Sequence, residues 1–187
     1  ELKDVKSATV IVDGKEIPYQ IDDLDGNGTN DELCFLVDLE GKQTKTATIT
    51  LSDKADGKQW KARTFAEMVL RNPKVKEKNK HDIYLSSITI DKRTTNPYNV
   101  LHHHGVAFES ELIAMRIYMD KRQTIDLYGK FHKGLELEQT QFYTSKEQKA
   151  QGYGDDVLWV GNTFGLGAFR GWNGTEPTLL EDVEHRT

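Results

Sequence analysis

The chain has 187 residues, of which 36% are hydrophobic and 29% are charged, and its net charge is −5 at neutral pH. This composition is too apolar for a disordered chain, and no run reaches the roughly 18 to 20 apolar residues of a membrane-spanning helix. No basic stripe accompanies the acidic balance, so we expect no nucleic-acid partner, because phosphate binding needs clustered Lys and Arg. The polar stretch Glu1 to Asp4 predicts that the chain carries no signal segment.

Residues 1–53 hold 5 Lys and Arg against 12 Asp and Glu, a net charge of −7, and are expected to form a separate β-strand module. Turn residues separate short runs rich in β-branched side chains, which is typical of strands. The expected strands run from Ala8 to Val12, from Ile17 to Ile21, from Leu33 to Val37 and from Thr46 to Leu51. Cys34 lies within the third run and is predicted to be a small buried hydrophobic residue.

An acidic segment between the second and third of these strands has the spacing of a calcium-binding loop. Its oxygen-bearing side chains at positions one, three, five and nine are Asp23, Asp25, Asn27 and Asp31. Gly28 stands at position six, whereas position twelve holds Cys34 in place of the glutamate of an EF-hand. The segment therefore predicts either a structural Ca²⁺ site or an acidic turn closed by Asx-type hydrogen bonds without an ion.

Residues 54–187 are expected to form part of a larger β-sandwich. Residues 61–70 fit either a strand or a helix, and Ile83 to Ile90 is expected to be a strand. The stretch Phe108 to Lys130 predicts a β-hairpin, with a turn from Asp120 to Gln123.

Polar side chains interrupt the apolar pattern of this predicted hairpin. They are Arg116, Tyr118, Asp126, Tyr128 and Lys130. Burying such groups unpaired costs about 2 kcal/mol or more each, so they should be hydrogen-bonded to one another or line a cleft. A purely structural alternative is an ion pair between Arg116 and Asp126 that fixes the register of the two strands.

The C-terminal region combines one expected helix with a glycine-rich segment that contains aromatic residues. The spacing from Thr144 to Glu147 is that of a capping box, and Gly152 is expected to end the helix. Trp159 follows two apolar residues and is predicted to lie in the core. Trp172 is the better candidate for stacking on a sugar ring, and Arg170 precedes it as a further substrate-binding candidate. The glycine spacing does not fit the dinucleotide-binding pattern, so no nucleotide cofactor is expected.

Three consecutive histidines, His102, His103 and His104, form the other candidate for chemistry. Neighbouring side chains on an extended chain point to opposite faces, so His102 and His104 are the two that could share a ligand. A metal site would need a further ligand, for which Glu109 or Glu111 is the obvious source. The alternatives are proton transfer by a histidine and a structural role.

Three segments, Asp22 to Val37, His104 to Lys130 and Gly152 to Trp172, resemble a family of secreted Bacteroidetes proteins from polysaccharide-utilisation systems that is labelled as a domain of unknown function. The family includes ulvan-oligosaccharide dehydratase-like proteins. The resemblance implies a β-sandwich similar to galactose-mutarotase-like proteins, a periplasmic or cell-surface location, and action on oligosaccharides. It also implies that this chain is the N-terminal part of a longer polypeptide, whose C-terminal part is an expected partner.

Together these features predict an all-β, mainly antiparallel protein with one or two short helices. The leading hypothesis is a lyase or dehydratase that eliminates water or an alcohol from an acidic oligosaccharide. Such a reaction needs a base, a cation for the carboxylate and an acid for the leaving oxygen.

We expect these roles to fall on five residues. His104 or Tyr128 would act as base or acid, with His102 as a further catalytic candidate, and Arg116 or Lys130 would meet the carboxylate. Tyr118 joins Trp172 and Arg170 as a candidate for substrate binding. The alternatives are a non-catalytic, calcium-stabilised module that binds glycans and a module that only supports a catalytic part elsewhere.

Overall fold

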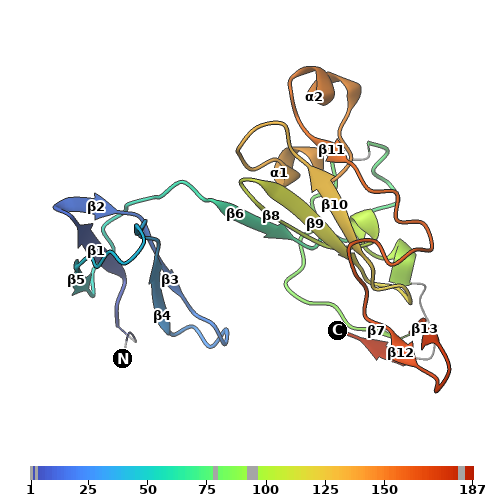
Figure 1. The fold of residues 1–187 in the computed structure, drawn as a ribbon, viewed down its shortest axis with the longest axis horizontal. Coiled ribbons are helices and arrows are strands. Elements are labelled where there is room, and N and C mark those ends of the chain that lie inside the picture. Colours follow the sequence, from blue (N-terminus) through green and yellow to red (C-terminus); the bar gives the residue numbers. More distant parts are fainter. Residues whose placement is uncertain (1, 3, 78–79, 92–96, 181–183) are drawn as a thin grey trace. The chain divides into compact units, whose positions relative to one another are not determined.

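The computed structural model describes residues 2, 4–77, 80–91, 97–180 and 184–187, and it consists of two compact units, Glu1–Lys61 and Ala62–Thr187 (Figure 1). The expected all-β class is confirmed, because antiparallel strands dominate both units and the α-helices are short. The two α-helices are α1 (Leu137–Thr140) and α2 (Lys146–Ala150). Across the described ranges, no helix combines the length and the apolar character that crossing a membrane requires.

The first unit contains a three-stranded sheet and a two-stranded hairpin. In the sheet, β1 (Ser7–Val12) lies between β2 (Lys15–Ile17) and β5 (Ala47–Ser52), and all pairs are antiparallel. The hairpin pairs β3 (Tyr19–Asp22) with β4 (Glu32–Phe35). The expected strand from Ile17 to Ile21 is thus divided at Pro18, which has no N–H for a sheet hydrogen bond.

The prediction that Cys34 is buried is wrong, since its side chain is exposed on β4. The hairpin β3–β4 is two-stranded, so alternate residues of β4 face solvent whether or not they are apolar.

The second unit is built on a five-stranded antiparallel sheet with the order β11-β10-β9-β8-β6. Figure 1 shows β8, β9 and β10 side by side at its centre. The strands are β6 (Thr64–Glu67), β8 (Gly105–Ser110), β9 (Ile113–Tyr118), β10 (Ile125–Gly129) and β11 (Asp155–Asp156). Smaller pairs join β7 (Ile90–Asp91) to β14 (His185–Arg186) and β12 (Gly171–Trp172) to β13 (Pro177–Thr178).

Two sequence expectations change in this unit. The long first strand of the predicted hairpin is two strands, because the chain reverses at Glu111 and Leu112 and pairs Glu109 with Ala114. The strand expected over Ile83 to Ile90 is wrong, since this segment makes only an isolated bridge at Tyr84 before β7 begins.

The helix expected near Thr144 is confirmed as α2, with its capping box one residue later than predicted. Ser145 accepts a hydrogen bond from the Gln148 backbone N–H, and the Gln148 side chain accepts one from the Ser145 N–H. Gly152 follows the helix with φ +91°, a conformation that favours glycine.

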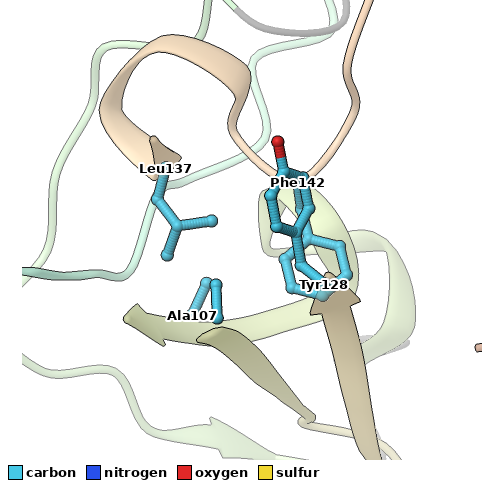
Figure 2. Close-up of a cluster of buried hydrophobic side chains, with 5 residues drawn as sticks. Ala107, Tyr128, Leu137 and Phe142 are labelled. Carbon is cyan, nitrogen blue, oxygen red and sulfur yellow. The ribbon is translucent and has the colours of Figure 1, made fainter. Parts of the chain in front are cut away.

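One face of the five-stranded sheet is covered by α1 and the segment after it. Leu137 of α1 and Phe142 pack over Ala107 of β8 and Tyr128 of β10 (Figure 2), and Ala114 completes this buried cluster. The same face carries buried polar residues of the edge strand β6 and of the central strands, because every second residue points to it. They are Glu67, Glu109, Arg116, Tyr118 and Asp126, all less than 9% exposed.

Candidate functional site

A cavity of about 620 Å³ lies in the second unit, where the buried sheet face meets the histidine triplet and the segment after β11. The triplet forms a single 3₁₀ turn, η2 (His102–His104), and a similar turn, η1 (Pro97–Asn99), precedes it. The side chains that line the cavity include Tyr98, His104, Arg116, Tyr118, Arg122, Asp126, Tyr143, Asp156 and Trp159.

His104 is held as a neutral imidazole with its proton on a defined nitrogen. Its Nδ1 lies 2.7 Å from the carbonyl oxygen of Tyr98, which can only accept, so Nδ1 carries the proton and Nε2 has the lone pair. Burial lowers the pKa of His104. The ring stacks on Tyr98 with centroids 3.7 Å apart, and no hydrogen bond reaches Nε2 from the residues that the structure describes. A neutral imidazole nitrogen with a free lone pair can accept a proton.

The backbone at the triplet is unusual for histidine. His103 has φ +40° and His104 has φ +67°, so two consecutive residues occupy the left-handed region that few side chains adopt. Such strained conformations persist where the surrounding structure fixes them and are concentrated at functional sites.

Arg116 is buried at the base of the cavity, and protein groups occupy all its donors. Its Nε and Nη2 donate to Asp126 Oδ2 at 2.8 and 2.6 Å, and Nη2 also donates to Asp156 Oδ2 at 3.1 Å. Nη1 donates to the Tyr143 hydroxyl at 2.9 Å and, more weakly, to the His103 carbonyl. The ion pair with Asp126 that the sequence offered as a structural alternative is therefore present, and Arg116 has no donor left for a substrate.

Tyr118 belongs to the same network. Its hydroxyl accepts from Arg116 Nη2 at 3.0 Å and donates to Asp126 Oδ2 at 3.2 Å. Burial raises its pKa, so the hydroxyl keeps its proton at neutral pH.

Tyr128 and Lys130 lie outside the cavity. The Tyr128 hydroxyl donates to Glu136 Oε2 at 2.8 Å, and the Tyr128 side chain is fully buried. Lys130 Nζ donates to the Glu109 carboxylate and to the carbonyls of Ser110 and Gly134. These two candidates are enclosed in the core and have their hydrogen bonds satisfied.

Arg122 brings a cation to the cavity that the sequence did not single out. Its guanidinium lies over the rings of Tyr98 and Tyr118, at 4.9 and 4.5 Å from their centroids. Asp120 pairs with Nε and Nη2, and Nη1 donates to the Gly161 carbonyl at 3.0 Å. Tyr98 also makes a side-chain hydrogen bond with Arg122. An arginine has five N–H donors, so Arg122 keeps one donor that these contacts do not use.

Asp156 is the most accessible acid of the Arg116 network, with a third of its side chain exposed. Burial, followed by the negative charge of Asp126, raises the pKa of Asp156. A carboxyl group with a raised pKa can hold a proton for transfer to a substrate.

The prediction that Trp159 lies in the core is wrong, because this residue is 93% exposed. Strand β11 ends at Asp156, so the apolar residues after it no longer alternate into the sheet. Trp159 lines the cavity, whereas Trp172 and Arg170 do not. Trp172 is exposed on β12, and Arg170 donates to the Arg122 carbonyl, which supports the segment that carries Arg122.

His102 and His103 occupy the buried side of the triplet. His102 lines a second cavity, which is described below. His103 Nδ1 lies 3.1 Å from the Gln141 carbonyl, and its Nε2 lies 3.8 Å from Glu67 Oε1. Glu67 is buried without a hydrogen-bond partner among the described residues, and burial raises its pKa to about 8.

The acidic loop of the first unit brings its three predicted carboxylate ligands together. Asp23, Asp25 and Asp31 each have an oxygen within 4.8 Å of the others, and all three are exposed. The loop also closes by itself, since Asp23 accepts from the backbone N–H groups of residues 26–28 at 2.6 to 3.1 Å. Asn27 donates to Asp25 and accepts from the Thr29 N–H. Calcium binding stays a prediction.

The cavity thus brings together His104, Arg116 and Tyr118 from the sequence-based set and adds Arg122, Asp156 and Trp159. Glu109 and Glu111 do not join the histidines as metal ligands: among the described residues, only the acidic loop gathers three ligand side chains. Two sequence features could have pointed to the added residues. Arg122 lies in the turn predicted from Asp120 to Gln123, and the acidic pair Asp155–Asp156 comes shortly before Trp159.

Residues 1–187 match the model of a family described as "Domain of unknown function (DUF4861)". No curated protein and no solved structure matches the chain.

Proposed function

We propose that this chain, which belongs to the family described as a domain of unknown function (DUF4861), acts on acidic oligosaccharides as a carbon–oxygen lyase or dehydratase. The observation that carries the proposal is the fixed tautomer of His104, whose unprotonated Nε2 is available beside the cavity. A secreted, periplasmic or cell-surface location within a polysaccharide-utilisation system is part of the proposal.

The proposed reaction is an elimination next to a sugar carboxylate. His104 Nε2 takes the proton from the carbon that bears the carboxylate, and the electron pair of that C–H bond becomes a carbon–carbon double bond. The neighbouring carbon–oxygen bond breaks, and its oxygen leaves as water or an alcohol after it receives a proton. The base and the acid return to their starting states by exchanging protons with water.

The carboxylate of the reacting sugar is assigned to Arg122. Arg116 and Lys130, the cations expected from the sequence, are fully occupied by protein acceptors. Arg122 retains one donor beyond its contacts with Asp120, Gly161 and Tyr98, in a lining that is otherwise rich in carboxylates. Neutralising the substrate carboxylate makes the adjacent proton easier to remove.

Asp156 is assigned as the acid for the leaving oxygen, because its carboxyl group is partly accessible and its pKa is raised. The reaction then requires a neutral His104 and a protonated Asp156. Burial lowers the pKa of His104 and raises that of Asp156, so both shifts increase the fraction of the protein in this state, and we expect a bell-shaped rate profile.

The test is to incubate the full chain with uronate oligosaccharides and to follow the absorbance of the conjugated alkene. His104→Asn should lower the rate at least ~100-fold, the usual minimum for losing a general base. Asparagine suits this position because it tolerates the left-handed backbone. The matched control is His132→Asn, which removes an exposed histidine outside the cavity and should leave the rate unchanged. No alkene from any uronate substrate would remove this proposal.

A second candidate is a non-catalytic module that binds glycans, and the exposure of Trp159 beside the cavity favours it. An exposed indole ring offers a flat apolar face on which a sugar can stack. Binding without turnover, lost in Trp159→Ala and retained in His104→Asn, would select this function. Trp172→Ala tests in the same way whether the exposed ring on β12 takes part.

The acidic loop would hold Ca²⁺ as a structural ion in either function. Carboxylate and amide oxygens are the ligands that Ca²⁺ prefers, and Asp23, Asp25 and Asp31 already converge. Thermal unfolding should shift upward on adding Ca²⁺ to the wild type and should not shift in Asp23→Asn. An equal response from both proteins would argue for the ion-free turn.

A further inference from the structure

A second cavity, of about 440 Å³, adjoins the one described above. It is lined by Arg71, His81 and His102, and it shares His104 and Tyr143 with the first cavity. The two cavities therefore meet at His104 and Tyr143.

His102 brings an unsatisfied polar atom to this second cavity. The residue is 6% exposed, and its Nε2 has no hydrogen-bond partner in the described part of the chain. Buried polar atoms without partners are rare in folded proteins and call for a ligand, a water or an ion.

His81 offers a donor next to it. The two imidazole rings lie 4.2 Å apart. His81 Nδ1 accepts from the Asn72 N–H at 3.1 Å, so the neutral ring carries its proton on Nε2.

The lining of the second cavity has more positive than negative charge. Arg71 Nη1 donates to the neutral Asn99 Oδ1 at 3.0 Å, and no carboxylate of the described ranges pairs with Arg71. Lys76 adds a second cation, and Glu77 is the single acid of the lining. In the first cavity, by contrast, Asp126, Asp155 and Asp156 outnumber Arg116 and Arg122.

We infer that this second cavity is an anion subsite, which binds a carboxylate or a sulfate ester on the sugar unit next to the one held at His104. Arg71 supplies the charge, His81 donates a hydrogen bond, and His102 gains a polar neighbour for Nε2. The role as a sugar subsite rests on the proposed function, whereas the binding of an anion does not. Arg71 is thus a specificity-determining residue for charged oligosaccharides.

The first experiment uses small anions, so that it does not depend on turnover. Inorganic sulfate and glucuronate are titrated separately into the full chain, and the imidazole resonances of His81 and His102 are followed by NMR. One or both anions should shift both resonances to saturation, and the stronger one identifies the preferred substituent. Arg71→Gln should weaken this response at least tenfold.

Arg63→Gln is the matched control, because Arg63 is an exposed arginine of the same unit outside both cavities. It should respond like the wild type. Resonances that do not move with either anion, or that move equally in Arg71→Gln, would overturn the inference and leave the proposed elimination intact.

The second experiment measures the affinity of oligosaccharides in the inactive His104→Asn background. Adding Arg71→Gln should lower affinity for the uronate oligosaccharide at least tenfold and leave affinity for its carboxyl-reduced counterpart unchanged. An equal loss for both ligands would contradict a charge-selective subsite. If the anions bind as expected while the wild type forms no alkene, the proposed elimination fails and the anion site stands.

Discussion

On one face of the five-stranded sheet, Arg116 and Asp126 are buried, whereas on the other face Phe108 and Ile117 remain 38% and 39% exposed. All four residues lie on the central strands β8, β9 and β10, so the alternation of side chains along each strand places them on different faces. The polar face is enclosed by the histidine turn and by the segment around Phe142, which converts it into the wall of a cavity. The apolar face has no comparable cover of buried residues within the described ranges.

The difference between the two faces shows where this unit is vulnerable. Buried charges are tolerated only when they are fully paired, because each has lost its hydration. Half-exposed apolar residues gain little from the fold and lose little when they are changed. We therefore expect stability and chemistry to depend on the polar face and to be nearly independent of the apolar one.

The largest expected effect comes from Arg116→Met. Removing this cation leaves Asp126 buried without its partner, which should destabilise the second unit by about 3–5 kcal/mol. Urea unfolding measures the loss. Arg116→Met combined with Asp126→Leu should recover part of the stability, because the only charge left without Arg116 is then Asp156, a third of whose side chain is exposed. A loss below about 1 kcal/mol for the single variant, as for an exposed ion pair, would contradict this account.

Glu67→Gln tests how the stability of the buried polar face depends on pH. The pKa of Glu67 is about 8 in the fold and has an ordinary value of 4.5, so the folded state favours the protonated acid. The contribution of the protonated Glu67 to the free energy of unfolding is fully present below pH 4.5 and is lost as the pH rises through 8. This loss should be on the order of 5 kcal/mol, from 1.36 kcal/mol per pKa unit.

The measurement for Glu67 is the free energy of unfolding of the wild type and of Glu67→Gln across this range. As the pH rises, the free energy of unfolding should fall in the wild type relative to Glu67→Gln, because glutamine cannot ionise. A difference that stays constant from pH 4.5 to 8 would show that Glu67 is already ionised or hydrated in the fold.

The smallest expected effect is on the apolar face. Ile117→Thr replaces a side chain that is 39% exposed by a β-branched residue of similar strand propensity. We expect a loss of less than about 1 kcal/mol in urea unfolding and no change in catalysis. A loss of stability comparable to that of Arg116→Met would mean that other residues cover the apolar face. The two faces would then not differ in their importance for stability.

The local features of the fold could be predicted from the sequence. The acidic turn forms from residues close together in the chain, and its Asx-type hydrogen bonds follow from that spacing. Arg116 and Asp126 lie directly opposite on neighbouring strands, so a cross-strand pair was a natural alternative. The strand reversal at Glu111 and Leu112 was missed because no glycine, proline or asparagine marks it.

The candidate site could be predicted only in part, because it joins segments that are distant in sequence. Asp156 reaches Arg116 across 40 positions, and Arg122 donates to Gly161 across 39. No pattern within one segment encodes such contacts. Tyr128 and Lys130 alternate like the site residues, but Glu136 and Glu109 satisfy them inside the core.

The left-handed backbone at His103 and His104 also limits how this protein can diverge during evolution. Most replacements at these positions would add backbone strain to the loss of the imidazole, whereas asparagine and glycine would not. On the proposed mechanism, a lineage that lost the elimination activity while keeping the fold would therefore accumulate asparagine or glycine at position 104 first. In such descendants, that single position would separate active from inactive members.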